Sequence, residues 1–129
     1  MTSKKLFLIK PSLKSGLDPK EHCIPGESPG EFAALQTEFF HRYAPGDHIE
    51  AFEVDMLIEN EWRLRRFRRI EAVLRQMPSS EKTDLSLASL QRLMKSIARS
   101  QKRTEAQIQR FQKARHKEMA ALECQPYVI

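Results

Sequence analysis

Few residues of this chain combine the types and the spacing that catalysis or metal binding requires. Glu38 and His41 have the Glu-x-x-His spacing of di-iron four-helix bundles, which places both groups on one helix face. A di-metal site needs a second such pair and two further carboxylates, so a surface histidine is the better interpretation. His22 and Cys23 are adjacent, but a thiolate nucleophile also needs a third group that orients the imidazole, and the sequence offers no candidate.

Local motifs of enzymes are also missing from the sequence. It contains no glycine-rich phosphate loop, no Gly-x-Ser-x-Gly elbow and no Cys-x-x-Cys pair. We therefore predict a non-enzymatic protein that uses no metal, no cofactor and no small-molecule substrate.

The strongest chemical signal is a run of arginines within an apolar stretch. Between Trp62 and Ile70, five arginines lie among four large apolar residues. Guanidinium groups bind phosphates, so such a surface suits DNA or RNA, with little sequence selectivity and a steep loss of binding in salt. The predicted nucleic-acid-binding residues are Arg63, Arg65, Arg66, Arg68, Arg69, Arg92 and Lys95.

Two other interpretations of these arginines stay open. In the first, the charges belong to a solvated, salt-bridged helical hairpin and bind no ligand. In the second, the same surface binds an acidic patch on another protein. Trp62 could stack on a base beside Arg63 and Arg66, but a tryptophan in this setting is more often part of the core.

The composition limits the fold class and the location. The chain has 129 residues, of which 40% are hydrophobic and 30% charged, with only four glycines, as expected for one all-α domain. Its net charge of +5 favours an acidic partner. Cys23 and Cys124 lack the spacing of a zinc site or a disulfide scaffold, which predicts a reducing cytoplasm. The first ten residues include only four consecutive apolar residues, too few for a signal peptide or a membrane span.

Proline and glycine divide the chain into an N-terminal arm and a helical part. The arm, residues 1–28, is expected to be extended because prolines and glycines interrupt it. Within it, residues 6–9 could form a short strand, which needs another chain or a helix surface to cover it. A short helix is predicted over 29–43, with Ser28 as N-cap. Its buried stripe consists of Phe32, Leu35, Phe39 and Tyr43.

Two long helices are predicted after this short one. The first begins at the N-cap Asp47 and runs for about 30 residues to Pro78, and the second begins near Asp84. A connection of about six residues makes them an antiparallel hairpin. The seam of the last helix is Leu87, Leu90, Met94, Ile97, Gln101, Thr104, Ile108 and Phe111. We predict one helical domain over 29–125 and a C-terminal tail over 126–129.

The first long helix changes the sign of its charge halfway along. Residues 47–61 hold six acids and no lysine or arginine, whereas residues 63–75 hold six arginines. In a hairpin reflected about residue ~80, the acids face Lys102, Arg103, Arg110 and Lys113. The arginines then meet Arg92 and Lys95, with only Glu71 as a nearby acid, so their charge is expected to stay uncompensated.

The same helix has more apolar residues than one short helix and one hairpin partner are expected to cover. An uncovered apolar patch usually marks an interface, so we predict a homo-oligomer. The predicted interface residues are Phe52, Met56, Leu57, Ile58 and Trp62.

Three elements of the sequence resemble a group of small helical bacterial proteins of unassigned function. They are residues 13–17 (Leu-Lys-Ser-Gly-Leu), residues 25–27 (Pro-Gly-Glu) and residues 62–66 (Trp-Arg-Leu-Arg-Arg). In those proteins a Lys-His-Gly-Leu element precedes the same Pro-Gly-Glu and Trp-x-Leu-Arg-Arg pattern, and Ser15 stands here where they have the histidine. The resemblance covers roughly residues 12–77 and implies a bacterial origin.

Overall fold

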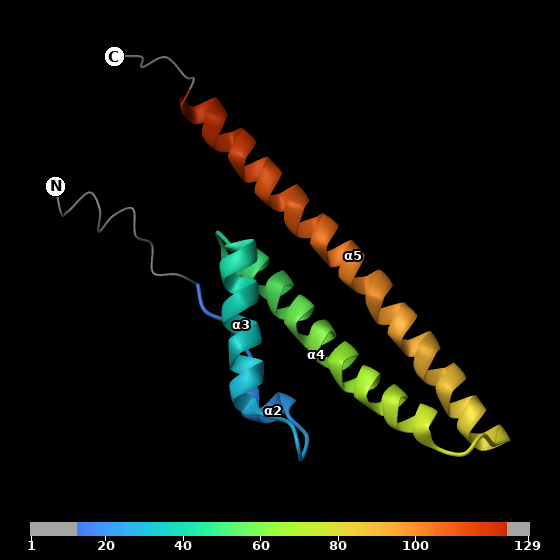
Figure 1. Cartoon of the computed structure of the whole chain (residues 1–129). Helices are drawn as coiled ribbons and strands as arrows, with labels where there is room; N and C mark the ends of the chain where they lie inside the picture. The colour runs from blue at the N-terminus through green and yellow to red at the C-terminus, as the bar shows by residue number, and fades with distance from the viewer. Residues whose placement is uncertain (1–12, 124–129) are drawn as a thin grey trace, which may run out of the picture. The chain divides into compact units, whose positions relative to one another are not determined.

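The computed structural model describes residues 13–123, and this part of the chain is all-α, as predicted (Figure 1). Its helices are α2 (Pro19–His22), α3 (Pro29–Tyr43), α4 (His48–Gln76) and α5 (Glu81–Glu123). None of these helices combines the length and the apolar character that crossing a bilayer requires. The strand predicted at residues 6–9 and the tail at 126–129 lie outside the described residues.

The chain forms two compact units, one ending at Asp55 and the other beginning at Met56. The boundary falls within α4, which is a continuous helix of 29 residues. Each unit has fully buried side chains, such as Phe32 and Val54 in the first and Ile58 and Ile108 in the second. The prediction of a single helical domain over 29–125 stays a prediction.

Helix α3 begins and ends where the sequence predicts. The Ser28 hydroxyl accepts a hydrogen bond of 3.2 Å from the Glu31 backbone N–H, so it caps one of the free donors of the first turn. At the other end, Ala44 adopts a left-handed conformation with φ of 42°, and its N–H donates to the Phe40 carbonyl. The predicted stripe is confirmed, because Phe32, Leu35 and Phe39 are buried and Tyr43 is half-buried.

The arm was predicted to be extended, but its described part contains the short helix α2. The Asp18 side chain accepts from the Lys20 N–H and Pro19 occupies the first helical position, so two adjacent residues start this helix. The His22 ring at its end stacks on Phe32 of α3, with ring centroids 5.2 Å apart. This part of the arm therefore packs on its own chain.

A polar cluster holds residues 15–17 against α3 and α4. Asp55 accepts hydrogen bonds from the Ser15 hydroxyl at 2.5 Å and from the Gly16 N–H at 2.9 Å. The Gln36 amide donates to the Ser15 hydroxyl and to the Leu17 carbonyl, each at 2.8 Å. The Leu-Lys-Ser-Gly-Leu element is thus a structural contact of the first unit, and we call these four bonds the Asp55 clasp.

Helix α4 begins after Asp47, as predicted. The Asp47 side chain accepts from the Glu50 N–H at 2.8 Å, and the Glu50 carboxylate accepts from the Gly46 N–H at 3.3 Å. This pair resembles a capping box moved by one residue, because Glu50 bonds Gly46 instead of the N-cap itself. Glu50 is only 1% exposed, so its charge is used inside the fold and not at the surface.

The second unit is a helical hairpin in which α5 runs antiparallel to the second half of α4 (Figure 1). The connection, residues 77–80, is shorter than predicted, and α5 begins at Glu81 instead of Asp84. The reason is local: the Ser80 hydroxyl accepts from the Thr83 N–H at 3.1 Å and caps the helix three residues earlier.

The seam of α5 is confirmed, since each of its predicted residues is buried or half-buried. The register is also close to the predicted reflection. Asn60 donates to Ser100 at 3.5 Å and Gln101 donates to Glu61 at 3.4 Å. Both are long for hydrogen bonds, so apolar burial of residues such as Leu90 and Ile108 contributes more to this pairing.

Candidate nucleic-acid interface

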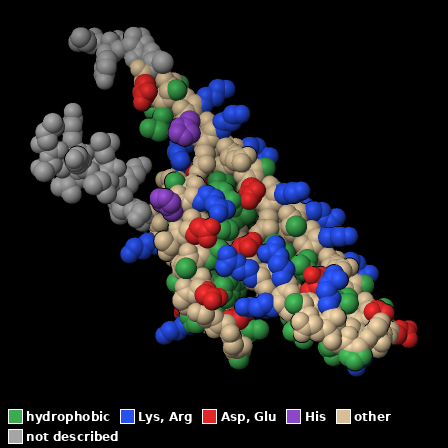
Figure 2. All heavy atoms as spheres, in the orientation of Figure 1, with side chains coloured by type: hydrophobic (Ala, Val, Ile, Leu, Met, Phe, Trp, Pro, Cys, Tyr) green, Lys and Arg blue, Asp and Glu red, His purple; other side chains and the backbone are tan. Residues whose placement is uncertain are grey.

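The seven predicted nucleic-acid-binding residues all lie in the hairpin, five on α4 and two on α5. Two of them, Arg65 and Arg66, are half-buried, and the other five are exposed: Arg63, Arg68, Arg69, Arg92 and Lys95. Lysine and arginine side chains gather along the length of α5, where acidic ones are fewer (Figure 2). The structure therefore brings these residues to the surface of one unit.

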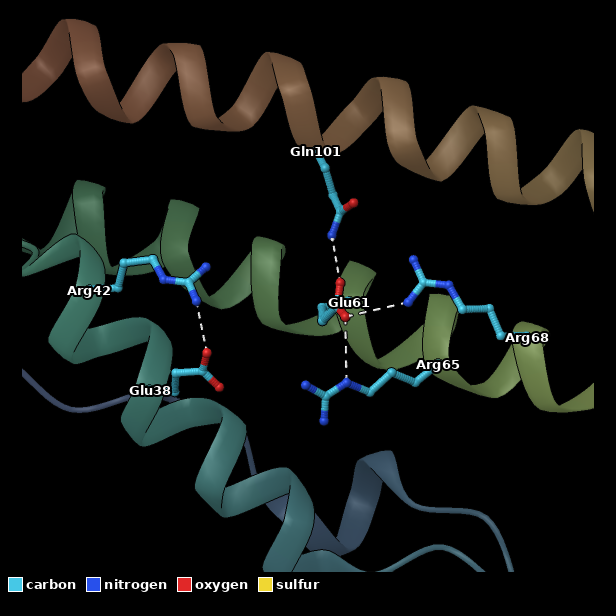
Figure 3. A network of polar contacts seen from close by, with 6 residues as sticks. All are labelled: Glu38, Arg42, Glu61, Arg65, Arg68 and Gln101. Atoms are coloured by element: carbon cyan, nitrogen blue, oxygen red, sulfur yellow. Dashed lines mark hydrogen bonds and ion pairs between the residues drawn. The ribbon is translucent and has the colours of Figure 1, made fainter.

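One acid compensates part of this charge, which corrects the expectation that only Glu71 would do so. Glu61 pairs with Arg65 at 3.4 Å and with Arg68 at 3.7 Å, and it also accepts from Gln101 (Figure 3). Glu71 pairs with Arg75 at 3.7 Å, outside the predicted set. Glu61 is thus the acidic side chain that orients two arginines of the candidate surface.

Three of the predicted cations have no acidic partner in the part of the chain that the structure describes: Arg63, Arg92 and Lys95. Arg63 and Lys95 form no ion pair there, and Arg92 is held only by a bond of 3.3 Å to the Ser89 hydroxyl. The predicted partners of the acidic half of α4 also form no ion pair within residues 13–123: these are Lys102, Arg103, Arg110 and Lys113. The ion pairs expected between the acidic half of α4 and these four cations are therefore not observed within the described residues.

The local charge is more positive than that of the whole chain. Residues 62–104 carry twelve lysines and arginines but only three acids, Glu71, Glu81 and Asp84. Because Debye screening at physiological salt extends about 8 Å, neighbouring cations on one hairpin act together on a ligand that touches them. The arrangement can therefore bind an extended polyanion at several points.

Three of the five predicted interface residues are part of the core of the single chain. Leu57, Ile58 and Trp62 are 1%, 0% and 3% exposed, so they are unavailable to another molecule. The expectation that one chain could not cover them is wrong, and Trp62 is a core residue that cannot stack on a base. Phe52 and Met56 are exposed, at 63% and 37%.

Other exposed apolar residues lie in the hairpin, outside the predicted interface. Ile70 and Val73 on α4 are 42% and 60% exposed, and Met77, which directly follows the helix, is 50% exposed. An open groove of about 560 Å³ runs between α4 and α5 near their connection. It is lined by Ile70, Leu74, Lys82, Leu85, Ser86, Ser89, Leu90 and Leu93. These exposed residues could have been recognised in the sequence, because Ile70, Val73 and Met77 follow one another at steps of three and four.

The residues weighed for chemistry do not come together. Glu38 pairs with Arg42 at 2.8 Å, on the same helix as the exposed His41 (Figure 3). Cys23 is half-buried, and the His22 ring lies against Phe32. Among the described residues, no group of three histidines, cysteines or acids could hold a metal ion.

No protein-family model, curated protein or solved structure matches this chain. The likeness of residues 12–77 to small bacterial proteins therefore stays a prediction, as does the bacterial origin that it implies. The function has to be inferred from the surface of the hairpin itself.

Proposed function

We propose that this protein is a non-enzymatic helical interaction module that binds nucleic acid without sequence selectivity through the basic surface of its hairpin. One observation carries the proposal: within residues 62–104, twelve cations are accompanied by three acids. A bacterial cytoplasm, the setting predicted from the sequence, would provide DNA and RNA in abundance.

The physical basis is the release of counterions from phosphates. Each phosphate that a lysine or arginine neutralises frees condensed cations, and this favours binding at low salt and weakens it steeply at high salt. Phosphate contacts carry no base information, so one surface can accept DNA and RNA alike. The exposed residues Arg68, Arg69, Arg92 and Lys95 are the contacts that we expect to matter most.

The test measures, by fluorescence anisotropy at two salt concentrations, how tightly the full chain binds labelled generic DNA and RNA. The arginine variant replaces Arg65, Arg66, Arg68 and Arg69 by glutamine. We expect it to bind at least about tenfold more weakly than the wild type at low salt, because it removes four potential phosphate contacts. The matched control replaces the four cations of α5 that lie beyond residue 104 by glutamine: Arg110, Lys113, Arg115 and Lys117.

The control variant has the same net charge as the arginine variant, so general attraction is equal in the two proteins. Stronger binding by the control would support a site at the arginines of α4. Equal binding by the two would show that only net charge matters. Absence of any binding by the wild-type chain at low salt would exclude the proposal.

A second candidate function is that of an adaptor whose basic surface binds an acidic protein. The open apolar groove favours it, since Leu85 and Leu93 are 62% and 53% exposed beside Lys82 and Arg92. A protein ligand that uses both features would lose less affinity in salt than nucleic acid, because apolar burial is not screened. The salt dependence of binding therefore separates the two functions.

A further inference from the structure

One face of α4 is exposed along most of the helix at alternating steps of three and four residues. Seven of its nine positions are exposed, and the other two, Glu59 and Arg66, are half-buried. Ile49, Phe52 and Val73 are 62%, 63% and 60% exposed. The nine positions are Ile49, Phe52, Met56, Glu59, Arg63, Arg66, Ile70, Val73 and Met77, the last of which directly follows the helix. Such spacing is that of a coiled-coil seam, and we call this set the outer seam of α4.

The outer seam has an unusual order of residue types. Its first three and its last three residues are apolar, and the three in the middle are Glu59, Arg63 and Arg66. The flanking charges differ as well, because acids precede the centre and arginines follow it. Two antiparallel copies of such a helix have complementary charges, because the acidic end of each copy lies beside the basic end of the other.

We propose that the outer seam is the interface of a two-fold symmetric dimer in which the α4 helices of two copies pack antiparallel. Placing Glu59 against Arg63 of the second copy also places Phe52 against Ile70 and Ile49 against Val73 of that copy. The two-fold axis repeats each of these pairs, so the interface is isologous and closes at two copies. The same register places Met56 against Arg66, so the seam forms four pairs and eight contacts. Six of these contacts, from the other three pairs, join complementary side chains.

Unsatisfied charges on the seam support this pairing. Glu59 and Arg63 are four residues apart on one helix, yet neither has an ion-pair partner within residues 13–123. Glu53, on the acidic side, also lacks one among the described residues. A parallel dimer would place each of these charges beside its own copy, whereas the antiparallel one pairs opposite signs.

The contact is long enough for a stable coiled coil. From Ile49 to Val73 the helix rises about 36 Å at about 1.5 Å per residue, which is just over three heptads. The dimer does not depend on the proposed nucleic-acid binding, because Arg68, Arg69, Arg92 and Lys95 lie outside the seam positions. Arg63 and Arg66 would belong to the dimer interface.

The first test measures the mass of the full chain by light scattering at tens of micromolar, without nucleic acid. We expect twice the monomer mass of 15.0 kDa. Glu59→Arg places two arginines against each other at each central pair, and Arg63→Glu places two glutamates there, so each variant alone should weigh 15.0 kDa. An equal mixture of the two variants pairs opposite signs at both positions and should restore the dimer mass.

The restoration shows that both variants are folded, and circular dichroism checks their helix content separately. A wild-type chain of monomer mass, a single variant that stays dimeric, or a mixture that stays monomeric would each overturn the proposal. None of these outcomes bears on nucleic-acid binding, which is measured with other variants.

The second test determines the direction of the two helices. Cys23 and Cys124 are first replaced by serine, and single cysteines are then introduced as Ile49→Cys or Val73→Cys, one of the two proteins carrying a tag. On oxidation, the antiparallel register predicts a disulfide between the two different variants when they are mixed and little in either alone. Disulfides that join two copies of the same variant, and none that join the two different variants, would show a parallel pair and overturn the register.

Discussion

The two units of this protein use their charged residues in different ways. In the first unit, acids make local bonds: Asp18 and Asp47 cap helices, Glu50 is buried at the start of α4, and Asp55 holds the arm. In the hairpin, arginines outnumber acids, and cations such as Arg63 and Lys95 have no acidic partner among the described residues. Charged groups therefore make local bonds in the first unit, whereas some cations of the hairpin have no acidic partner among the described residues.

The exposure of apolar residues also differs between the α3 stripe and the connection of the hairpin. The first unit covers its α3 stripe almost completely, with Phe32 at 0% and Leu35 at 1% exposure. The hairpin buries its seam but exposes Ile70, Leu85 and Leu93 near the connection. Contiguous exposed apolar residues beside uncompensated charge usually mark a binding surface, which supports the proposal that the hairpin binds a ligand. The first unit also exposes apolar residues, which include Ile49 and Phe52 of the outer seam of α4.

The largest effect should come from opening a cavity in either core. Phe32→Ala should lower the free energy of unfolding by about 3–5 kcal/mol and Ile108→Ala by about 2–5 kcal/mol, since each removes a fully buried side chain. Leu85→Ala, at an exposed position, is the control and should cost under about 0.5 kcal/mol. Urea unfolding, monitored by circular dichroism, measures the free energy of unfolding of all three variants. A small loss for Phe32→Ala alone would show that the first unit is not the more tightly packed one.

A smaller effect should follow from weakening the Asp55 clasp. Asp55→Asn keeps one acceptor but turns an amide N–H toward the Ser15 hydroxyl or the Gly16 N–H, and we expect a loss of about 1–2 kcal/mol. Glu53→Gln removes the same charge from the same helix at a position without a bond among the described residues, and it should be nearly neutral.

Limited trypsin digestion gives a local measure of the same change. Lys14 precedes the clasp and is exposed, so cleavage after it should be faster in Asp55→Asn than in the wild type or in Glu53→Gln. Equal cleavage of the three proteins would show that the clasp contributes little to holding the arm.

The sequence predicted those parts of the fold that depend on local signals. The bounds of α3 follow from Ser28-Pro29 and from Ala44-Pro45-Gly46, whose capping and stopping effects need no distant contact. The start of α5 was predicted three residues too late because both Ser80 and Asp84 have side chains that can cap a helix. Helix α2 was missed because it is too short to show a periodic pattern. The hairpin register followed from the loop length and the seam together.

The predicted interface was partly wrong because periodicity identifies an apolar face without identifying what covers it. Leu57, Ile58 and Trp62 meet that description as well as Phe52 does, and only the packed structure separates the buried residues from the exposed one. The ion pair between Glu61 and Arg65, by contrast, could have been predicted from the sequence, because acids and bases four residues apart commonly pair on a helix.

The smallest effect on stability, and the most direct test of the comparison, should come from Glu61→Gln. Glu61 is partly exposed, with a side-chain exposure of 21%, so its ion pairs with Arg65 and Arg68 contribute about 0–1 kcal/mol together. Urea unfolding should therefore change little. Removing the carboxylate frees both guanidinium groups, however, and adds one positive charge to the basic surface.

If the hairpin is the polyanion-binding unit, Glu61→Gln should bind generic DNA a few-fold more tightly than the wild type at low salt, with a steeper dependence on salt, because two more cations can contact phosphates. Glu118→Gln is the matched control: it removes one exposed acid from α5 that has no ion pair within residues 13–123. An equal gain in both variants would mean that net charge alone attracts DNA. A gain confined to Glu61→Gln would place the contact at Arg65 and Arg68, where an acid of the same helix now competes with the ligand.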